Sequence, residues 1–320
     1  MKARHNAVCK TILIALSLVP FQPAICGKTQ GERASFAKRA AAAGNEAAHE
    51  RLDLQITGFD KIVNSYDTDI VYTQGDTVSV VAEATADVLA AVYVNVSDST
   101  LTLGCKQDLQ PAVFPGTLTL HVTAPGLYAV TNNCNMTLTA DSLTASSLAL
   151  SNHGAANIRL RGTVIGPASI SNYGNMQLDG ALKAGSLEFV NNGACSLRAD
   201  LRVHTGIELS NRGNLKYEGK AEAFYAEIAN SGAGRYDADI KAKHTEMSIS
   251  GNARGKVSIK GDKVNVKCSG AANMNMALEC ETLSVSSNGN ARLKVSGTAD
   301  YVEFTGKGAA NIDTSGLNKF

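Results

Sequence analysis

Apolar and polar residues alternate along most of the chain after residue 52, and the alternation restarts at a fixed spacing. Counted from a glycine at position 0 of each repeat, positions +2 and +4 are small or apolar, whereas positions +3 and +5 are polar. A second apolar pair precedes the next glycine. A period of two is typical of half-buried β-strands, so each repeat is expected to hold two short strands. No helical period is visible between residues 53 and 320.

Nine glycines mark the repeat at intervals of 19 or 20 residues, and Cys134 occupies the same position one interval earlier. The residue after this position alternates without exception between Asn and Ala, from Asn135 to Ala309. A fixed period of this length predicts a β-helix-like solenoid of about ten repeats, in which each repeat buries its apolar face against its neighbours. The glycines are expected to make tight corners because glycine tolerates positive φ. They are Gly154, Gly174, Gly193, Gly213, Gly232, Gly251, Gly270, Gly289 and Gly308.

An asparagine also stands two residues before the corner in six consecutive repeats. Asparagine tolerates the left-handed conformation, and its amide can bond to the local backbone. Six such residues in register predict a ladder of stacked side-chain amides. They are Asn132, Asn152, Asn172, Asn191, Asn211 and Asn230.

One turn of the solenoid is here called a rung. Neither the spacing of the glycines nor the alternation of Asn and Ala decides whether a rung contains one repeat or two. In a one-repeat rung, each Asn after the corner lies between two Ala residues of the neighbouring rungs. In a two-repeat rung, Asn lies on Asn and Ala lies on Ala. The one-repeat rung is favoured, because its two sheets can close over a single layer of side chains about 10 Å thick.

The rest of the sequence divides into a leader, a linker and a cap. Residues 1–26 combine three basic residues with a short apolar run, which is typical of a cleaved secretory signal peptide, and Cys26 allows a lipidated N-terminus as the alternative. No later segment is apolar over the length of a transmembrane helix. Residues 27–52 are Ala-rich and predict a linker. Residues 53–130 are strand-rich but out of register, so they are expected to cap the solenoid of residues 131–320 and to form its first irregular rungs.

Charge and cysteine content narrow the functional classes. Without residues 1–26 the formal net charge falls from +1 to −2, since three positive charges and no negative ones are lost. A nearly neutral chain is not built as a whole for nucleic acid. Five cysteines follow Cys26, an odd number without a CxxC motif, which argues against a disulfide-stapled domain or a zinc site. Cys195 and Cys280 are expected to be buried free thiols.

β-Helices often host polysaccharide lyases and hydrolases, which need clustered acids with Ca²⁺ or paired carboxylates. Acidic residues at position +5 are mixed with basic ones, the six histidines do not assemble, and no G-x-S-x-G motif occurs. The sequence therefore predicts no catalytic residues, no metal and no cofactor. A polysaccharide-active enzyme is the alternative to a binding protein, and a passive structural protein of the envelope is another.

Two columns of outward side chains are candidates for ligand binding, although long polar side chains also cover the outer face of any sheet. Position +3 is basic in several repeats, and two lysines at +5 add to it. A ladder of fixed cations can hold a polyanionic glycan through several weak contacts at once. The first column consists of Lys216, Arg235, Arg254, Lys256, Arg292 and Lys294; the second, at position +12, consists of Tyr225, His244, Lys263 and Tyr301.

The stretch ITGFDKIVNSYDTDIVYTQGDTVSVVAE, followed by STLTLG and by VTAPGLYAV at the entry to the repeats, resembles the putative auto-transporter adhesin head GIN domain family of Bacteroidetes-type bacteria. The resemblance covers roughly residues 53–317. It implies a right-handed β-helix-like superhelix and a role in cell adhesion, and it carries no catalytic residues onto this chain. The family's Gly-Ser-Gly corner is replaced here by Gly-Asn-Ala or Gly-Ala-Ala.

Pattern and resemblance together predict an all-β, non-enzymatic protein of the cell envelope or surface. We expect it to be exported to the periplasm, the outer-membrane surface or the exterior. Its expected partners are cell-surface glycans or other envelope components, and not nucleic acid. Self-association is left open by the sequence.

Overall fold

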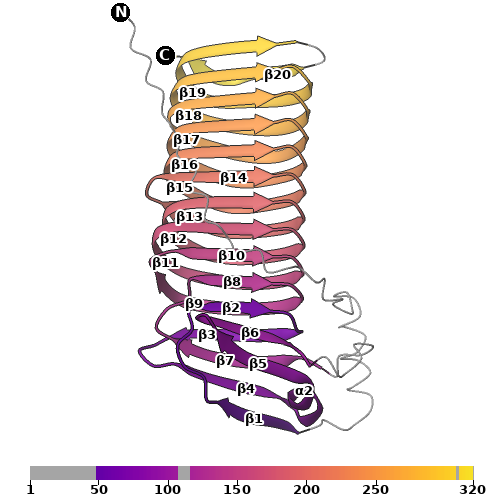
Figure 1. The fold of residues 1–320 in the computed structure, drawn as a ribbon. Coiled ribbons are helices and arrows are strands. Elements are labelled where there is room, and N and C mark those ends of the chain that lie inside the picture. The colour runs from indigo at the N-terminus through magenta and orange to yellow at the C-terminus, as the bar shows by residue number, and fades with distance from the viewer. Residues whose placement is uncertain (1–47, 107–115, 308–309, 320) are drawn as a thin grey trace, which may run out of the picture.

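The computed structural model describes residues 48–106, 116–307 and 310–319. The expected signal peptide, the lipidation candidate Cys26, the linker up to residue 47 and the corner Gly308 lie outside these residues. The described chain is a β-solenoid of about ten turns whose rungs stack along one axis (Figure 1). The all-β fold class predicted from the alternation is confirmed.

Each 19-residue or 20-residue repeat forms one rung, so the one-repeat alternative is confirmed. Asn252 is the register partner of Ala271 on the next rung, and Ala271 is the partner of Asn290. Neighbouring rungs pair in parallel throughout the regular part. Its strands are β9 (Asn135–Ala145), β10 (Leu148–Asn152), β11 (Ala155–Asn172), β12 (Asn175–Asn191), β13 (Ala194–Val203), β14 (Gly206–Asn211), β15 (Asn214–Asn230), β16 (Ala233–Ile249), β17 (Asn252–Cys268), β18 (Ala271–Ser287), β19 (Asn290–Gly306) and β20 (Asn311–Lys319).

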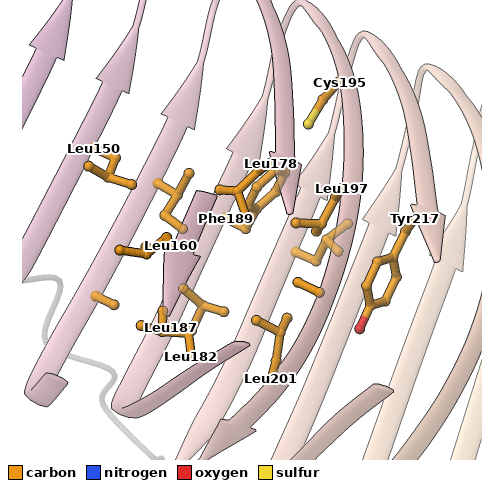
Figure 2. Packing of buried hydrophobic residues seen from close by; sticks show 14 of the residues in the cluster. Leu150, Leu160, Leu178, Leu182, Leu187, Phe189, Cys195, Leu197, Leu201 and Tyr217 are labelled. Atoms are coloured by element: carbon orange, nitrogen blue, oxygen red, sulfur yellow. The ribbon is translucent and has the colours of Figure 1, made fainter. Parts of the chain in front are cut away.

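Every rung contributes to two sheets that enclose the core. Positions +1 to +9 lie in what we call the first sheet, and positions +12 to +17 lie in the second sheet. Met176 and Leu178 point inward from the first sheet and Leu187 and Phe189 from the second, and all four are buried. Figure 2 shows Leu178, Leu187 and Phe189 gathered between the strands. The alternation of the sequence thus becomes one continuous core along the axis.

The corner glycines are required for a reason other than the one expected. Positive φ is found at only four glycines among the described residues, Gly58, Gly219, Gly255 and Gly297, and none of them is a corner. At each described corner, a Cβ would instead overlap a backbone carbonyl of the rung below, well inside the 3.0 Å that real Cβ atoms keep. Close packing of successive rungs therefore selects glycine, and the expectation of positive φ was wrong. The ladder asparagines also avoid the left-handed region.

The predicted amide ladder is confirmed and is longer than expected. Each Nδ2 donates to the Oδ1 of the asparagine on the next rung at 2.7 to 2.8 Å. Asn64 of β2 (Lys61–Asn64) begins the ladder below Asn132, which the sequence did not predict because 68 residues separate the two. The ladder ends at Asn230, whose Oδ1 also accepts a hydrogen bond from the Tyr236 hydroxyl at 3.1 Å. These asparagines are buried, so the ladder satisfies amides that would otherwise be costly to bury.

The N-terminal segment caps the solenoid, with one helix that the sequence did not predict. Antiparallel strands close both sheets. In one, β4 (Ser79–Thr85) pairs with β1 (His49–Leu54) and β7 (Leu118–Ala124). In the other, β5 (Val92–Ser97) pairs with β6 (Thr100–Cys105). The short helix α2 (Ala86–Ala91) connects β4 to β5 and buries Val88 and Ala91. Six residues are too few to reveal a helical period. The remaining elements are β3 (Thr68–Gln74) and β8 (Ala129–Asn132).

The order of the first rungs in space differs from their order in the sequence. Strands β2 and β3 form one rung. On one side it pairs with the rung formed by β6 and β7, and on the other side with the rung formed by β8 and β9. The strand β1 begins at His49, inside the segment expected to be linker. At the other end, β20 pairs with β19 only up to Ala299, so Val302 and Phe304 are only partly buried.

The thiols agree with the sequence at the two positions named there. Cys195 and Cys280 are buried and free, and burial raises the pKa of Cys195 to about 12. Cys134, which occupies the corner position of its repeat, is disulfide-bonded. In the described part of the chain, no helix has the length and hydropathy that crossing a membrane requires.

Candidate functional site

The basic residues singled out in the sequence form one column on the outer face of the first sheet. Residues at position +3 are register partners on successive rungs, with Asn273 interrupting the series between Arg254 and Arg292. Parallel strands lie about 4.8 Å apart, so the fold fixes the spacing of the charges. The basic column, as we call it, consists of Lys216, Arg235, Arg254 and Arg292 at position +3 and of Lys256 and Lys294 at position +5.

Acidic neighbours neutralise the N-terminal end of this column. Lys216 Nζ lies 2.6 Å from Glu218 Oε1, and this hydrogen bond is the main cause that holds the pKa of Glu218 below its ordinary value. Arg198 lies 3.4 Å from both Asp179 and Glu218. This part of the first sheet is the mixed-charge ladder that the sequence predicted.

The C-terminal part of the basic column keeps its charges unpaired. Hydrogen bonds from Ser315 are the main cause that lowers the pKa of Asp313, and the nearby charge of Lys294 adds a smaller contribution. None of the cations in this part of the column forms an ion pair with a described residue of the first sheet. These cations are Arg235, Arg254, Lys256, Arg292 and Lys294.

A shallow groove of about 790 Å³ runs along the solenoid axis beside the basic column. Positions +1 and +2 of six successive rungs, from Ala155 to Asn252, form its floor. Most of these side chains are small, which leaves the groove open. Lys216, Arg235 and Arg254 form part of its wall, so the groove and the basic column belong to the same face.

A second hollow of about 520 Å³ continues the groove toward the C-terminal end. It is lined by residues of three corners, among them Asn252, Ala271 and Asn290. Asn252 also lines the first groove, so the two hollows meet at this residue. Together they follow a single line of residues at position +1, from Ala155 to Asn290.

The second predicted column is only partly assembled. Tyr225, His244 and Lys263 are register partners on successive rungs, whereas Tyr301 stands two rungs beyond Lys263. The Tyr225 hydroxyl donates to Glu227 Oε2 at 3.3 Å, and burial is the main reason that its pKa is raised to about 12. Tyr301 is largely exposed near the C-terminal end.

An exposed aromatic residue that the sequence pattern did not predict lies beside this second column. Phe224 is 53% exposed and lines a hollow of about 530 Å³ together with His204, Thr205, Gly206 and Tyr225. His244 meets its ring edge-on at 5.8 Å, and Lys243 Nζ lies 5.6 Å from the ring centroid. Phe224 has no aromatic counterpart at its repeat position, where Lys243 stands on the next rung, so periodicity gave no signal.

Acidic side chains do line up on the second sheet, which corrects the expectation that outward acids do not cluster. That expectation came from position +5, whereas the column lies at position +14, or at +15 in the repeat that begins at Gly193. Glu227 accepts the Tyr225 hydrogen bond, and Glu246 pairs with Lys267 at 2.7 Å. No group of three histidine, cysteine or acidic side chains in the described chain is placed to hold a metal ion. The column consists of Glu188, Glu208, Glu227 and Glu246.

A family described as "Putative auto-transporter adhesin, head GIN domain" matches residues 58–166 and 246–319, more than half of the chain. No curated protein is significantly similar to the sequence.

Among solved structures, a putative adhesin from Bacteroides fragilis is 17% identical over 83% of this chain and 97% of its own, with a TM-score of 0.37. A putative adhesin from Parabacteroides distasonis is 15% identical over 86% and 97%, with a TM-score of 0.44. A putative lipid binding protein from the same species is 13% identical over 84% and 97%, with a TM-score of 0.46.

Proposed function

The chain belongs to the putative auto-transporter adhesin head GIN domain family, and from this premise we propose that it is a non-enzymatic binding protein of the cell surface or envelope that holds an anionic glycan along its first sheet. The observation that carries the proposal is the groove beside the basic column. A long open groove suits a polymer, and the unpaired cations Arg235 and Arg254 in its wall suit negative charge.

The rigidity of the solenoid supports this function. The parallel sheet fixes the backbone positions from which the cations project, so a polymer that matches several of them gains affinity without ordering the backbone. Each contact is exposed and screened by salt, so a single charge contributes little. Several contacts on one chain act together, which favours a polymer over a small anion.

The test is the reversal of four of the five cations of the C-terminal part, in the variant Arg254→Glu, Lys256→Glu, Arg292→Glu and Lys294→Glu. We expect binding of an acidic polysaccharide such as hyaluronan to fall on the order of a hundredfold at low salt, since several contacts are replaced by repulsion. Biolayer interferometry on immobilised polymer measures the change.

The control reverses four cations of another column on the same sheet: Lys183→Glu, Arg202→Glu, Lys241→Glu and Lys260→Glu. It changes the net charge equally but leaves the groove intact. Equal loss in both variants would mean that overall charge, and not this column, governs binding. Unchanged binding in the folded first variant would rule the column out as the binding face.

A further inference from the structure

Position +1, directly after the corner, carries an alternation that packing does not require. Asn and Ala follow each other on successive rungs as register partners, and these residues line both hollows of the groove. The Asn/Ala column, as we call it, consists of Ala155, Asn175, Ala194, Asn214, Ala233, Asn252, Ala271 and Asn290.

The buried ladder shows what asparagine does when every rung carries one. There each amide bonds to the amide of the next rung, so its hydrogen-bonding capacity is used within the protein. In the Asn/Ala column the intervening alanine separates the amides by two rungs, about 9.6 Å at the spacing of parallel strands, which is too far for a hydrogen bond. The side chains of Asn175, Asn214, Asn252 and Asn290 form no hydrogen bond to any described residue. Their donors and acceptors therefore face the groove.

The buried ladder also fixes the backbone under these amides. Asn152 Nδ2 donates to the carbonyl of Asn175 at 3.1 Å, and Asn191 Nδ2 donates to that of Asn214 at 3.1 Å. Asn230 Nδ2 makes the same bond to Asn252 at 3.2 Å. The floor of the groove is thus held at a constant spacing before any ligand arrives, which lowers the cost of binding.

We propose that the Asn/Ala column recognises an extended polysaccharide with a disaccharide repeat, lying along the solenoid axis. This inference rests on the proposed function and specifies its ligand. Two rungs, about 9.6 Å, match the length of a disaccharide unit in an extended glycan chain. An amide both donates and accepts, as sugar hydroxyls do, so one amide meets each disaccharide. The alanine between two amides leaves room for the second sugar ring, and an acidic group on each disaccharide faces the basic column.

Two variants change the column in opposite ways. Asn175→Ala with Asn214→Ala and Asn252→Ala removes three amides from the groove. Ala194→Asn with Ala233→Asn fills the gaps, so that neighbouring amides bond to one another as in the buried ladder. Both should fold, because each rung already accepts Ala or Asn at this position. Ala229→Asn is the matched control, since it makes the same change on the outer face of the second sheet.

The experiment compares hyaluronan, which carries one carboxylate per disaccharide, with inorganic polyphosphate, which is a polyanion without sugars. We expect hyaluronan affinity to fall on the order of tenfold in both groove variants and to stay unchanged in the control. Polyphosphate affinity should stay the same in all of them. With hyaluronan oligosaccharides of increasing length, the affinity of the wild type should rise with each added disaccharide.

The outcomes separate the two proposals. If the wild type binds neither polymer, the proposed function is wrong and the inference falls with it. If the wild type binds only polyphosphate, or binds hyaluronan equally well in all variants, the cations hold polyanions and the Asn/Ala column recognises nothing. Loss of hyaluronan binding in the groove variants alone supports the inference.

Discussion

Two buried tyrosines, Tyr217 and Tyr236, differ in whether the side-chain hydroxyl forms a hydrogen bond, and this difference should affect stability. Tyr217 and Tyr236 are register partners on neighbouring rungs, and both are fully buried. The Tyr236 hydroxyl donates to Asn230 at the end of the amide ladder. The Tyr217 hydroxyl has no hydrogen-bond partner among the described residues, and burial raises its pKa. Leaving a polar group buried without a partner costs free energy.

Replacing each tyrosine by phenylalanine should therefore have opposite effects. Tyr217→Phe removes an unpaired hydroxyl, so the free energy of unfolding should rise by about 1 kcal/mol. Tyr236→Phe removes a bonded hydroxyl and should lower it by about 1 kcal/mol. Chemical denaturation of the two variants beside the wild type measures the difference. A loss of stability in both would show that the Tyr217 hydroxyl has a partner in solution.

At the scale of the elements, the contact between successive rungs determines which residue each corner accepts. A Cβ on Gly213 would overlap the Gly193 carbonyl of the rung below. A Cβ on Gly206, at the start of β14, would find its nearest atom 3.6 Å away, at ordinary contact distance. Gly213→Ala should lower the free energy of unfolding on the order of 3 kcal/mol, because the rungs must separate locally. Gly206→Ala is the control and should change it by less than about 1 kcal/mol. Thermal and chemical unfolding of both variants measure the difference. An equal loss of unfolding free energy in Gly213→Ala and Gly206→Ala would contradict the role of close approach between the rungs.

The contact between successive rungs also explains which features could be predicted from the sequence and which could not. The period of two located the strands, and the 19-residue interval placed Arg254 on the rung between Arg235 and Asn273, because parallel pairing keeps equal repeat positions together. The reason for the glycines was missed, since the carbonyl below them becomes visible only when the rungs are stacked. The pairing of Asn64 with Asn132 was missed because no repeat connects them. The groove was missed because it depends on the backbone of six rungs and not on one motif.

At the scale of the whole molecule, the solenoid is a one-dimensional stack whose two ends differ. Antiparallel strands and α2 close the N-terminal end, and the amide ladder runs from Asn64 to Asn230. The ladder positions beyond it are Ile249, Cys268 and Ser287, and the buried Ser287 hydroxyl has no hydrogen-bond partner within the part of the chain that the structure describes. The last cations of the basic column, Arg292 and Lys294, therefore lie beyond the ladder, near the C-terminal end of the described chain.

Stability should fall along the axis, since in a solenoid each rung is stabilised mainly by its immediate neighbours. We expect amide hydrogen exchange to be slowest between β9 and β15, where the ladder joins the rungs, and fastest in β20 and in the second half of β19, where Val302 and Phe304 are partly exposed. Exchange followed by mass spectrometry measures this gradient. Asn191→Ala breaks the ladder in its middle and should speed exchange in β12 and β14, whereas Ala229→Asn, on the outer face, should not. Uniform protection from β9 to β20 would mean that the solenoid opens as one cooperative unit and that the ladder adds no local stability.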